Sequence, residues 1–268
     1  MKDTTCLLRT GIAAAALLGL AGTLAGTALA QENAGAKDAR ALFKAMSDYV
    51  SGQKAISFTY DSNIEIVTPE LQKLTFASSG TATVNRPDKM RMTRTGGFAD
   101  VELSYDGKTL GLAGKNLNVF TKLPMTGSLD EVIDTLRSQF GLDAPAADLL
   151  SSNPDGVMMS NVIDAKDLGS GVIGGVECDH LAFRTTDTDW QIWITQGDKP
   201  RPCRFTITSK MLALAPEYTI EVSDWKDGSA VTADDFSLKM PADAREVKLE
   251  ELKGVGDIPD IASGGDVQ

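Results

Sequence analysis

The sequence predicts an α+β fold in which helices cover a curved antiparallel sheet, and three observations lead to this prediction. Apolar and polar residues alternate over about eleven residues in the segments 56–66 and 74–84, which indicates strands about 35 Å long, longer than an average sandwich strand. Four further alternating runs fill Val176 to Trp225, the pattern of an antiparallel meander with one buried face. Segments with helical periodicity precede and interrupt the strands, and they can cover that face.

The first half of the chain predicts one helix followed by about six sequential strands. The helix covers 36–51, where the apolar stripe consists of Ala39, Leu42, Phe43, Met46 and Val50. After the two long strands, a turn at Arg86 to Asp88 leads into shorter alternating runs, separated by Gly96-Gly97 and by the hairpin signal Asp106-Gly107. These runs fall at 90–92, 101–105, 110–112 and 117–122.

In the middle of the chain the period of the apolar residues changes from two to that of a helix. Ser128 to Glu131 forms a capping box, and Gly141 is a suitable left-handed stop. The apolar stripe of this helix is Leu129, Val132, Ile133, Leu136 and Phe140. Pro145 opens a second, shorter helix through Leu150, and 157–163 is interpreted as a third helical piece. We expect the first two helices to plug the open side of the sheet.

The last part of the chain completes the sheet in this prediction. The segment 165–172 pairs with 176–184 through the turn at Gly174-Gly175 and leads into the meander. After the meander, we expect 236–238 to close the sheet. One domain over 36–249 follows from this arrangement, with a flexible tail over 250–268, where charge, Gly and Pro dominate.

The first thirty residues are predicted to be a secretory signal peptide rather than part of the fold. Lys2 and Arg9 precede an apolar run from Ile12 to Leu24, and Ala28-Leu29-Ala30 is a small-x-small cleavage site. The mature chain then begins at Gln31, with residues 31–35 as a linker. The apolar run is too short and too rich in small residues for a strong membrane span.

Two details of the leader define the predicted route and destination. A single Arg, rather than a pair, precedes the apolar run, which argues against the twin-arginine pathway. Cys6 lies before the apolar run, so it is not the lipid-modified Cys that follows a lipoprotein signal. We therefore expect an exported protein without a lipid anchor, located in the periplasm.

The charge of the chain narrows the range of partners. Removing two basic residues and one acidic residue with the leader changes the formal net charge from −11 to −12, and the sequence pI is near 4.6. An acidic protein is a poor partner for nucleic acid or for anionic membrane surfaces. Its partners are expected to be neutral, cationic or apolar.

The two cysteines of the exported chain, Cys178 and Cys203, indicate a disulfide, because an even pair in an oxidising compartment normally pairs. They begin two strands that run in the same direction with one strand between them. Strands two apart are about 10 Å from each other, too far for a disulfide unless the middle strand ends early or bends away. Two reduced, buried thiols therefore remain the alternative.

Candidate catalytic and metal-binding residues are few. Cys178, His180 and Cys203 could supply three soft metal ligands. A fourth ligand is missing, however, and a disulfide between the two cysteines would remove both thiolates. A nucleophile elbow and a triad pattern are both absent from the sequence, so His180 is expected to satisfy a local hydrogen bond. We predict no enzyme activity, no metal site and no cofactor.

The remaining polar signals have structural interpretations. Asp187 and Asp189 fall in a hairpin turn, and Asp234 with Asp235 marks a loop or helix start, without the spacing of an EF-hand. The glycines from Gly169 to Gly175 lack the Lys and helix of a phosphate-binding loop, and they predict a hairpin.

The meander also carries a family resemblance. The segments Gly175 to Phe183, Asp189 to Ile194, Gly197 to Pro200 and Ser223 to Trp225 resemble a bacterial family of predicted periplasmic proteins of unknown function, similar to the LolA-like superfamily of lipoprotein carriers. The resemblance covers most of 36–249, and its Cys-Asp-His and Trp-Gln-Ile-Trp segments are the most specific. It implies an unclosed β-barrel with helices plugging the concave side and an apolar cavity between them.

From the resemblance and the apolar inward face we expect a monomeric carrier or binder of a lipid, an acyl chain or a lipidated protein. The alternative is a periplasmic interaction or sensor domain on the same fold, whose partner is another envelope protein. Met at successive inward positions suits an adaptable pocket, although any covered sheet buries such residues. Trp193 is the opposite choice for the inward face of its strand. The predicted cavity residues are Phe58, Tyr60, Phe76, Met90, Met92, Leu103, Tyr105, Trp190, Ile192 and Ile194.

Overall fold

The computed structural model describes residues 24–97, 99–140 and 146–252 of the 268-residue chain, with side chains described from residue 35 onward except at 139 and 140. The predicted signal peptide, 1–30, lies largely outside these residues, as does the predicted tail from 253 onward. Among the described residues, no helix is both long enough and apolar enough to span a bilayer.

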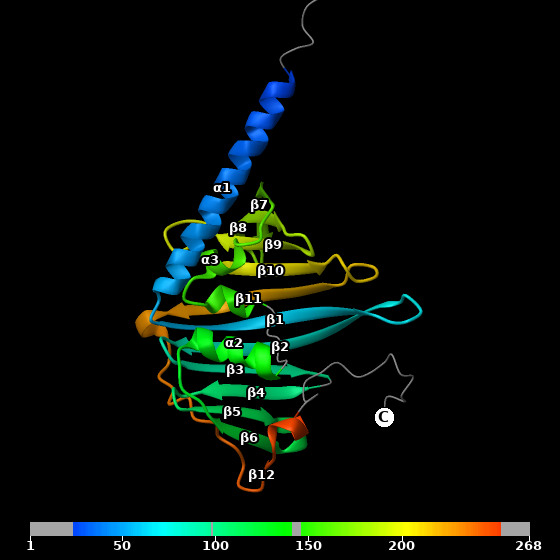
Figure 1. Ribbon diagram of the computed structural model, residues 1–268. Helices are drawn as coiled ribbons and strands as arrows, with labels where there is room; N and C mark the ends of the chain where they lie inside the picture. Colours follow the sequence, from blue (N-terminus) through cyan, green and yellow to red (C-terminus); the bar gives the residue numbers. More distant parts are fainter. Residues whose placement is uncertain (1–23, 98, 141–145, 253–268) are drawn as a thin grey trace, which may run out of the picture.

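The described residues form one twelve-stranded, curved sheet that does not close (Figure 1). Its two edge strands, β12 and β7, lie at opposite ends of the strand order β12-β6-β5-β4-β3-β2-β1-β11-β10-β9-β8-β7. All neighbours are antiparallel except β12, which runs parallel to β6. The strands are β1 Ala55–Val67, β2 Lys73–Asn85, β3 Lys89–Gly96, β4 Asp100–Tyr105, β5 Thr109–Gly114, β6 Val119–Pro124, β7 Asp164–Ile173, β8 Val176–Arg184, β9 Thr188–Thr195, β10 Pro202–Ser209, β11 Glu217–Asp227 and β12 Arg245–Glu246. The predicted fold class is confirmed.

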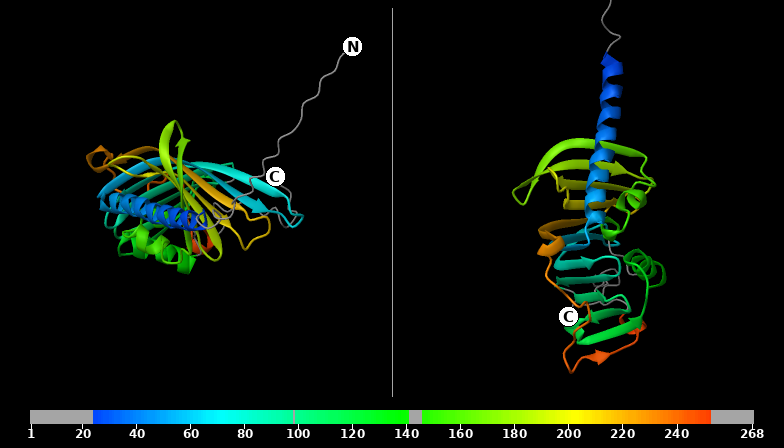
Figure 2. Two further views of the ribbon diagram at one scale, coloured as in Figure 1. Left: turned by 90° about the horizontal axis from the view of Figure 1, so that it is seen from above. Right: turned by 90° about the vertical axis from the view of Figure 1, so that its left-hand side faces the viewer.

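Helices cover the concave side of the sheet in two groups (Figure 2, left). The long helix α1, Leu24–Gly52, crosses the end of the sheet that contains β7 and β8. The second group is α2, Leu129–Phe140, with the 3-10 turn η2, Ala147–Leu150, and the short helix α3, Pro154–Met158. The two groups meet where α3 and η2 contact α1. Three further 3-10 turns connect strands: η1 Lys115–Leu117, η3 Gly228–Ala230 and η4 Leu249–Leu252.

The core beneath α1 is filled. Phe43 is completely buried, with its ring centroid 5.6 Å from that of Phe183 and 5.3 Å from that of Trp190. Four residues of the predicted helical stripe, Ala39, Phe43, Met46 and Val50, have no exposed surface. The predicted helix at 36–51 is confirmed, but α1 begins at Leu24 and therefore continues through the predicted linker at 31–35.

Cys178 and Cys203 form a disulfide, as expected from their compartment, with 7.0 Å between their Cα atoms. Two features bring these atoms closer than the usual spacing of strands two apart. Cys178 lies opposite Thr195, the last residue of the intervening strand β9. On the other side, the register of β9 and β10 shifts between Pro202 and Arg204, so Cys203 lies in a bulge. The middle strand therefore ends where the bond forms.

Two predicted elements are wrong. The third helical piece was expected at 157–163, but α3 covers Pro154–Met158, because Asn153 caps it by accepting a hydrogen bond from Gly156 N at 3.0 Å. Pro154 takes the first helical position, where the missing N–H of proline costs nothing.

The second correction concerns the predicted closing strand at 236–238. Phe236 is buried with a left-handed φ of 59°, and the segment lies as a strap on the convex face of the sheet instead of extending it. The Nε of Arg91 on β3 donates to Asp234 at 2.6 Å, and Gly111 leaves room for Leu238, whose Cβ would lie 2.7 Å from a Cβ at Gly111. The strand that extends the sheet is β12.

The chain is also ordered beyond the predicted end of the domain. Leu252, in η4, is buried in a small cluster with Val119 and Val247. The first residues of the predicted tail, 250–252, therefore belong to the fold.

Candidate functional site

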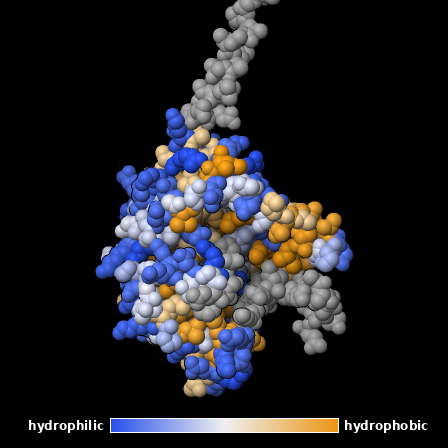
Figure 3. Space-filling model, viewed as in Figure 1, coloured by the Kyte–Doolittle hydropathy of each residue, from blue (hydrophilic) through white to orange (hydrophobic). Residues whose placement is uncertain are grey.

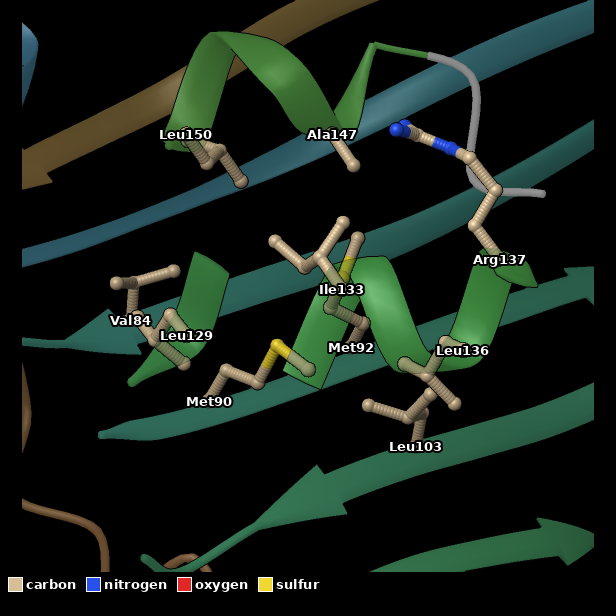
Figure 4. A pocket seen from close by; sticks show the side chains of 10 residues that line it. All are labelled: Val84, Met90, Met92, Leu103, Leu129, Ile133, Leu136, Arg137, Ala147 and Leu150. Atoms are coloured by element: carbon tan, nitrogen blue, oxygen red, sulfur yellow. The ribbon is translucent and has the colours of Figure 1, made fainter. Parts of the chain in front are cut away.

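An apolar pocket lies between α2 and η2 on one side and strands β2, β3 and β4 on the other (Figure 4). It contains about 540 Å³ of space not filled by protein atoms, part of it open to solvent. Nine of its ten lining residues are apolar and the tenth is Arg137. The lining residues are Val84, Met90, Met92, Leu103, Leu129, Ile133, Leu136, Arg137, Ala147 and Leu150.

Strand register builds the floor of the pocket. Met92 on β3 lies opposite Leu103 on β4, and Met90 lies opposite Val84 on β2. Because side chains alternate between the faces of a strand, residues two apart, such as Met90 and Met92, project to the same side. Met92 and Leu103 pack against the edge of the core but are only half-buried, because part of their surface faces the pocket.

The roof of the pocket is α2, which begins with the predicted capping box. The backbone N–H of Ser128 donates to Glu131 Oε2 at 2.7 Å, and the N–H of Glu131 donates to Ser128 Oγ at 3.4 Å. The bond from the Ser128 N–H, together with one from the Ser128 hydroxyl to Glu131 Oε2 at 3.0 Å, lowers the pKa of the Glu131 carboxyl. The helix turns Leu129, Ile133 and Leu136 toward the sheet (Figure 4), so the apolar stripe predicted from the sequence supplies the roof.

Polar contacts attach the roof to the following segment. Arg137 Nη2 donates to Asp148 of η2 at 3.0 Å, at the end of the pocket near Leu136. Near the start of α2, both the N–H and the hydroxyl of Ser152 donate to the carboxylate of Asp130. Ala146 precedes η2 with a left-handed φ of 70°, which turns Ala147 and Leu150 into the pocket.

The predicted cavity residues fall into two groups in the structure. Met90, Met92 and Leu103 line the pocket, with Leu129, Ile133 and Leu136 of the predicted plug helix. Val132 of that helix is buried in the core, and the side chain of Phe140 lies outside the described residues. Buried in the core but not lining the pocket are Phe58, Tyr60, Tyr105, Trp190, Ile192 and Ile194.

Specific contacts explain why several of these residues are core. The Phe58 ring stacks on Trp225 with 5.4 Å between centroids. Tyr60 donates its hydroxyl to Thr93 O at 2.8 Å and fits because Gly80 has no Cβ to meet its ring; burial raises the Tyr60 pKa to about 12. Tyr105 donates to Gly127 O at 2.8 Å, and burial raises its pKa too.

Phe76 differs from both groups because it is half-buried near the far end of β2. The residues that the sequence prediction missed are Val84, Arg137, Ala147 and Leu150. Val84 could have been predicted, because it follows the two-residue period of the other inward residues of β2. The contribution of η2 could not, because it depends on a turn after residues 141–145, which lie outside the described part of the chain.

The convex face carries the second tryptophan of the meander. Trp193 stacks on His180 with 4.1 Å between centroids, and the Arg204 guanidinium lies 5.6 Å from the Trp193 ring. His180 Nε2 is 2.8 Å from Gln191 Oε1, a local hydrogen bond as predicted. Both cysteine sulfurs are bonded to each other in the disulfide, so Cys178, His180 and Cys203 do not offer three soft metal ligands. Trp190 is therefore the inward residue of this strand.

The carboxylate pairs considered as sites make structural contacts. Asp187 accepts from the Thr185 hydroxyl at 2.8 Å, which lowers its pKa, and Asp189 binds Arg184 and Lys210. Asp234 accepts from Arg91, and this bond lowers the Asp234 pKa. Asp235 accepts from the backbone N–H and the hydroxyl of Ser237, which lowers its pKa to about 2. Among the described residues, no group of three or more metal-ligand side chains is clustered.

An unclosed, curved antiparallel sheet with helices on its concave face is the architecture that the sequence predicts. The chain belongs to the family described as predicted periplasmic protein (DUF2092), whose family model matches residues 39–250. A search of curated proteins found no match.

Several solved structures are similar to this chain at low identity. Lipoprotein LppX of Mycobacterium tuberculosis is 14% identical, with 74% of this chain and 99% of that chain covered and a TM-score of 0.48. LprF of Mycobacterium bovis is 11% identical, with 75% and 98% covered and a TM-score of 0.44. MucB, in the Pseudomonas aeruginosa MucA/MucB complex, is 12% identical, with 75% and 61% covered and a TM-score of 0.42. The family assignment rests on the match to the family model.

Proposed function

We propose that this protein is a periplasmic, non-enzymatic binding or carrier protein that holds a hydrophobic ligand in the pocket under α2. The ligand class is a lipid, an acyl chain or the lipid moiety of a lipidated protein. The observation that supports this proposal is the pocket itself, in which nine of ten lining residues are apolar. Apolar pockets with few polar groups bind apolar ligands by removing their surface from water.

The affinity depends on how much of the alkyl chain the pocket and a shift of α2 together bury. Each methylene removed from water contributes about 0.8 kcal/mol, so an alkyl chain with ten buried methylenes gains about 8 kcal/mol before the cost of ordering it. Met90 and Met92 on the floor adapt to chains of different shape, because their side chains are unbranched and polarizable.

Entry and release of the ligand require α2 to move. The roof contacts of its two ends, Asp130 with Ser152 and Arg137 with Asp148, involve exposed polar groups, which contribute little stability. These polar contacts therefore resist a shift of α2 only weakly, and its main cost is the exposure of the buried Leu129, Val132 and Leu136. Helix α1 buries a longer stripe, with Ala39, Phe43, Met46 and Val50 completely covered. The opening step belongs to α2 and η2 rather than to α1.

The alternative is an interaction or sensor domain with an envelope protein as partner and without a lipid cargo. The filled core beneath α1 is compatible with either function. A pocket beneath α2 is required only for ligand binding, so we favour the carrier.

Native mass spectrometry with lipid extraction, on protein isolated gently from a bacterial periplasm, tests this function. We expect an acyl-bearing adduct that is lost in Ile133→Asp, which places a charge in the pocket, and in Ile133→Trp, which fills it. Leu117→Asp, on exposed η1 away from the pocket, is the matched control and keeps the adduct. Circular dichroism verifies that each variant is folded.

A clean ligand-free mass for the wild-type protein, repeated after incubation with membranes and with no lipid in the extract, contradicts the carrier and supports the interaction domain. An adduct that persists in both Ile133 variants contradicts the location of the site.

A further inference from the structure

Two hairpin tips lie side by side at one end of the sheet (Figure 1). The loop between β1 and β2 covers 68–72, and the loop between β10 and β11 covers 210–216. They are neighbours because β1 pairs with β11, with Ile64 opposite Tyr218. A further contact joins them, since the N–H of Glu217 donates to Glu65 Oε2 at 2.9 Å. The two loops together are called the apolar tip below.

The apolar tip exposes large apolar side chains. Met211 is 76% exposed, Leu212 60% and Leu214 50%, and Leu71 in the adjacent loop is 58% exposed. The stretch 211–216 contains no charged residue. In Figure 3, orange side chains gather over this protruding end. Single exposed apolar residues are normal on a protein surface, but a cluster of them on one protrusion indicates an interaction site.

The backbone holds these side chains in place at a conformational cost. Leu71, Leu214 and Ala215 have φ values of 64°, 57° and 44°, in the left-handed region that favours glycine. Such conformations cluster where the surrounding structure and function require them. No glycine occurs between Lys210 and Pro216 to relieve this cost.

Part of the backbone of the 210–216 loop is hydrogen-bonded within the hairpin. The N–H of Leu212 donates to Ser209 O, that of Ala215 to Leu212 O, and that of Ser209 to Pro216 O at 3.0 Å. Pro216 has no N–H. Because an apolar environment penalises unpaired backbone groups, a loop with internal hydrogen bonds enters such an environment at lower cost.

Strand β2 connects the apolar tip with the pocket. Near the tip, Leu74 lies opposite Ile66 and Phe76 lies opposite Ile64, all half-buried on the inward-facing side. Further along the same face of the same strand, Val84 lines the pocket. The tip therefore continues into the concave face that leads to the proposed binding site.

We propose that the apolar tip inserts into the interfacial layer of a zwitterionic phospholipid bilayer, which is the donor or acceptor of the alkyl ligand. A convex protrusion whose 211–216 stretch is uncharged offers no groove to a shaped partner but fits a fluid layer that closes around it, with Glu70 of the adjacent loop kept in the polar headgroup region. The formal charge of −11 disfavours anionic bilayers. Lys210, at the base of the loop, is already paired with Asp189 at 3.0 Å, so it offers no free cation for anionic lipid. This inference rests on the proposed carrier function and names where its ligand is exchanged.

Co-flotation of the purified protein with phosphatidylcholine vesicles tests the proposal. We expect the wild-type protein to float with the vesicles. The triple variant that combines Met211→Ser, Leu212→Ser and Leu214→Ser should bind them at least about tenfold more weakly, because three apolar side chains are no longer buried in the bilayer. Val172→Ser with Val176→Ser is the matched control, since both residues are exposed at the β7–β8 hairpin, and it floats like the wild type.

Acyl occupancy by native mass spectrometry separates this inference from the proposed function. If the wild-type protein carries an acyl adduct but does not float, the membrane insertion of the apolar tip is contradicted and the carrier function is not. If the wild-type protein carries no adduct, the carrier function itself is contradicted. Flotation that is equal in the triple variant also overturns the tip. Flotation that requires phosphatidylglycerol and disappears at high salt contradicts the proposal, because binding is then electrostatic. A dimer that forms in the wild type and not in the triple variant, with vesicles binding neither protein, contradicts it too.

Discussion

At the scale of single residues, Asp189 of β9 connects strand β8 with the loop that follows β10. Its carboxylate accepts from Arg184 Nη2 of β8 at 2.8 Å and lies 3.0 Å from Lys210 Nζ, which also donates to Thr185 O. The bond from Arg184 is the largest cause that lowers the Asp189 pKa to about 2, with Lys210 adding to it. The ionised carboxylate therefore stabilises the folded state and anchors the base of the apolar tip.

We predict that Asp189→Asn lowers the free energy of unfolding by about 1 kcal/mol at pH 7. A pKa shift of two units corresponds to about 2.5 kcal/mol, but the side chain is 30% exposed and solvent screens the charges. Because the folded pKa is lowered, the stabilisation is complete above the ordinary pKa of about 3.9 and is lost as the pH falls toward 2. Urea unfolding between pH 7 and pH 3 measures it. Asp198→Asn, on an exposed loop, is the control, and a difference independent of pH contradicts the prediction.

At the scale of elements, α1 is attached to the sheet by its buried stripe. Phe43→Ala removes a ring that contacts Phe183 and Trp190, and we expect it to lower the free energy of unfolding by about 3–5 kcal/mol. Lys44→Ala, on the exposed side of the same helix, should change it by less than about 0.5 kcal/mol. Urea unfolding monitored by Trp fluorescence compares the two. Equal, small effects contradict a role for α1 in the core.

Elements with sustained periodicity could be predicted from the sequence, and short or ambiguous ones could not. The two-residue period covers 56–66 and 74–84, most of the 13 residues in each of β1 and β2, and the capping box predicts the start of α2. By contrast, Asn153-Pro154 ends one helix as readily as it begins another, and β12 has only two residues, too few for a pattern.

The candidate site shows the same division. Parity along β3 places Met90 and Met92 on one face, so their position on the pocket floor follows from the sequence. That Trp190, Ile192 and Ile194 are filled core depends on Phe43 of a helix more than a hundred residues away, which no local pattern contains.

At the scale of the whole molecule, the two covers of the sheet differ. Beneath α1 the core is filled by interlocking aromatic rings, whereas α2 and η2 leave an apolar pocket over β2 to β4. In the proposed function, the cover formed by α2 and η2 admits the apolar ligand, whereas α1 stays packed on the sheet. The apolar tip lies on the hairpins between these two regions, since β1 and β11 occupy the middle of the strand order.

Titration of the protein with a series of linear fatty acids of increasing length tests binding in this pocket most directly. If alkyl burial drives binding, affinity rises about fourfold for each added methylene until the pocket is full and then levels off, because each methylene contributes about 0.8 kcal/mol. Ile133→Trp, which shortens the pocket, should level off at a shorter chain. An affinity that does not depend on chain length, or a series unchanged by Ile133→Trp, contradicts the account.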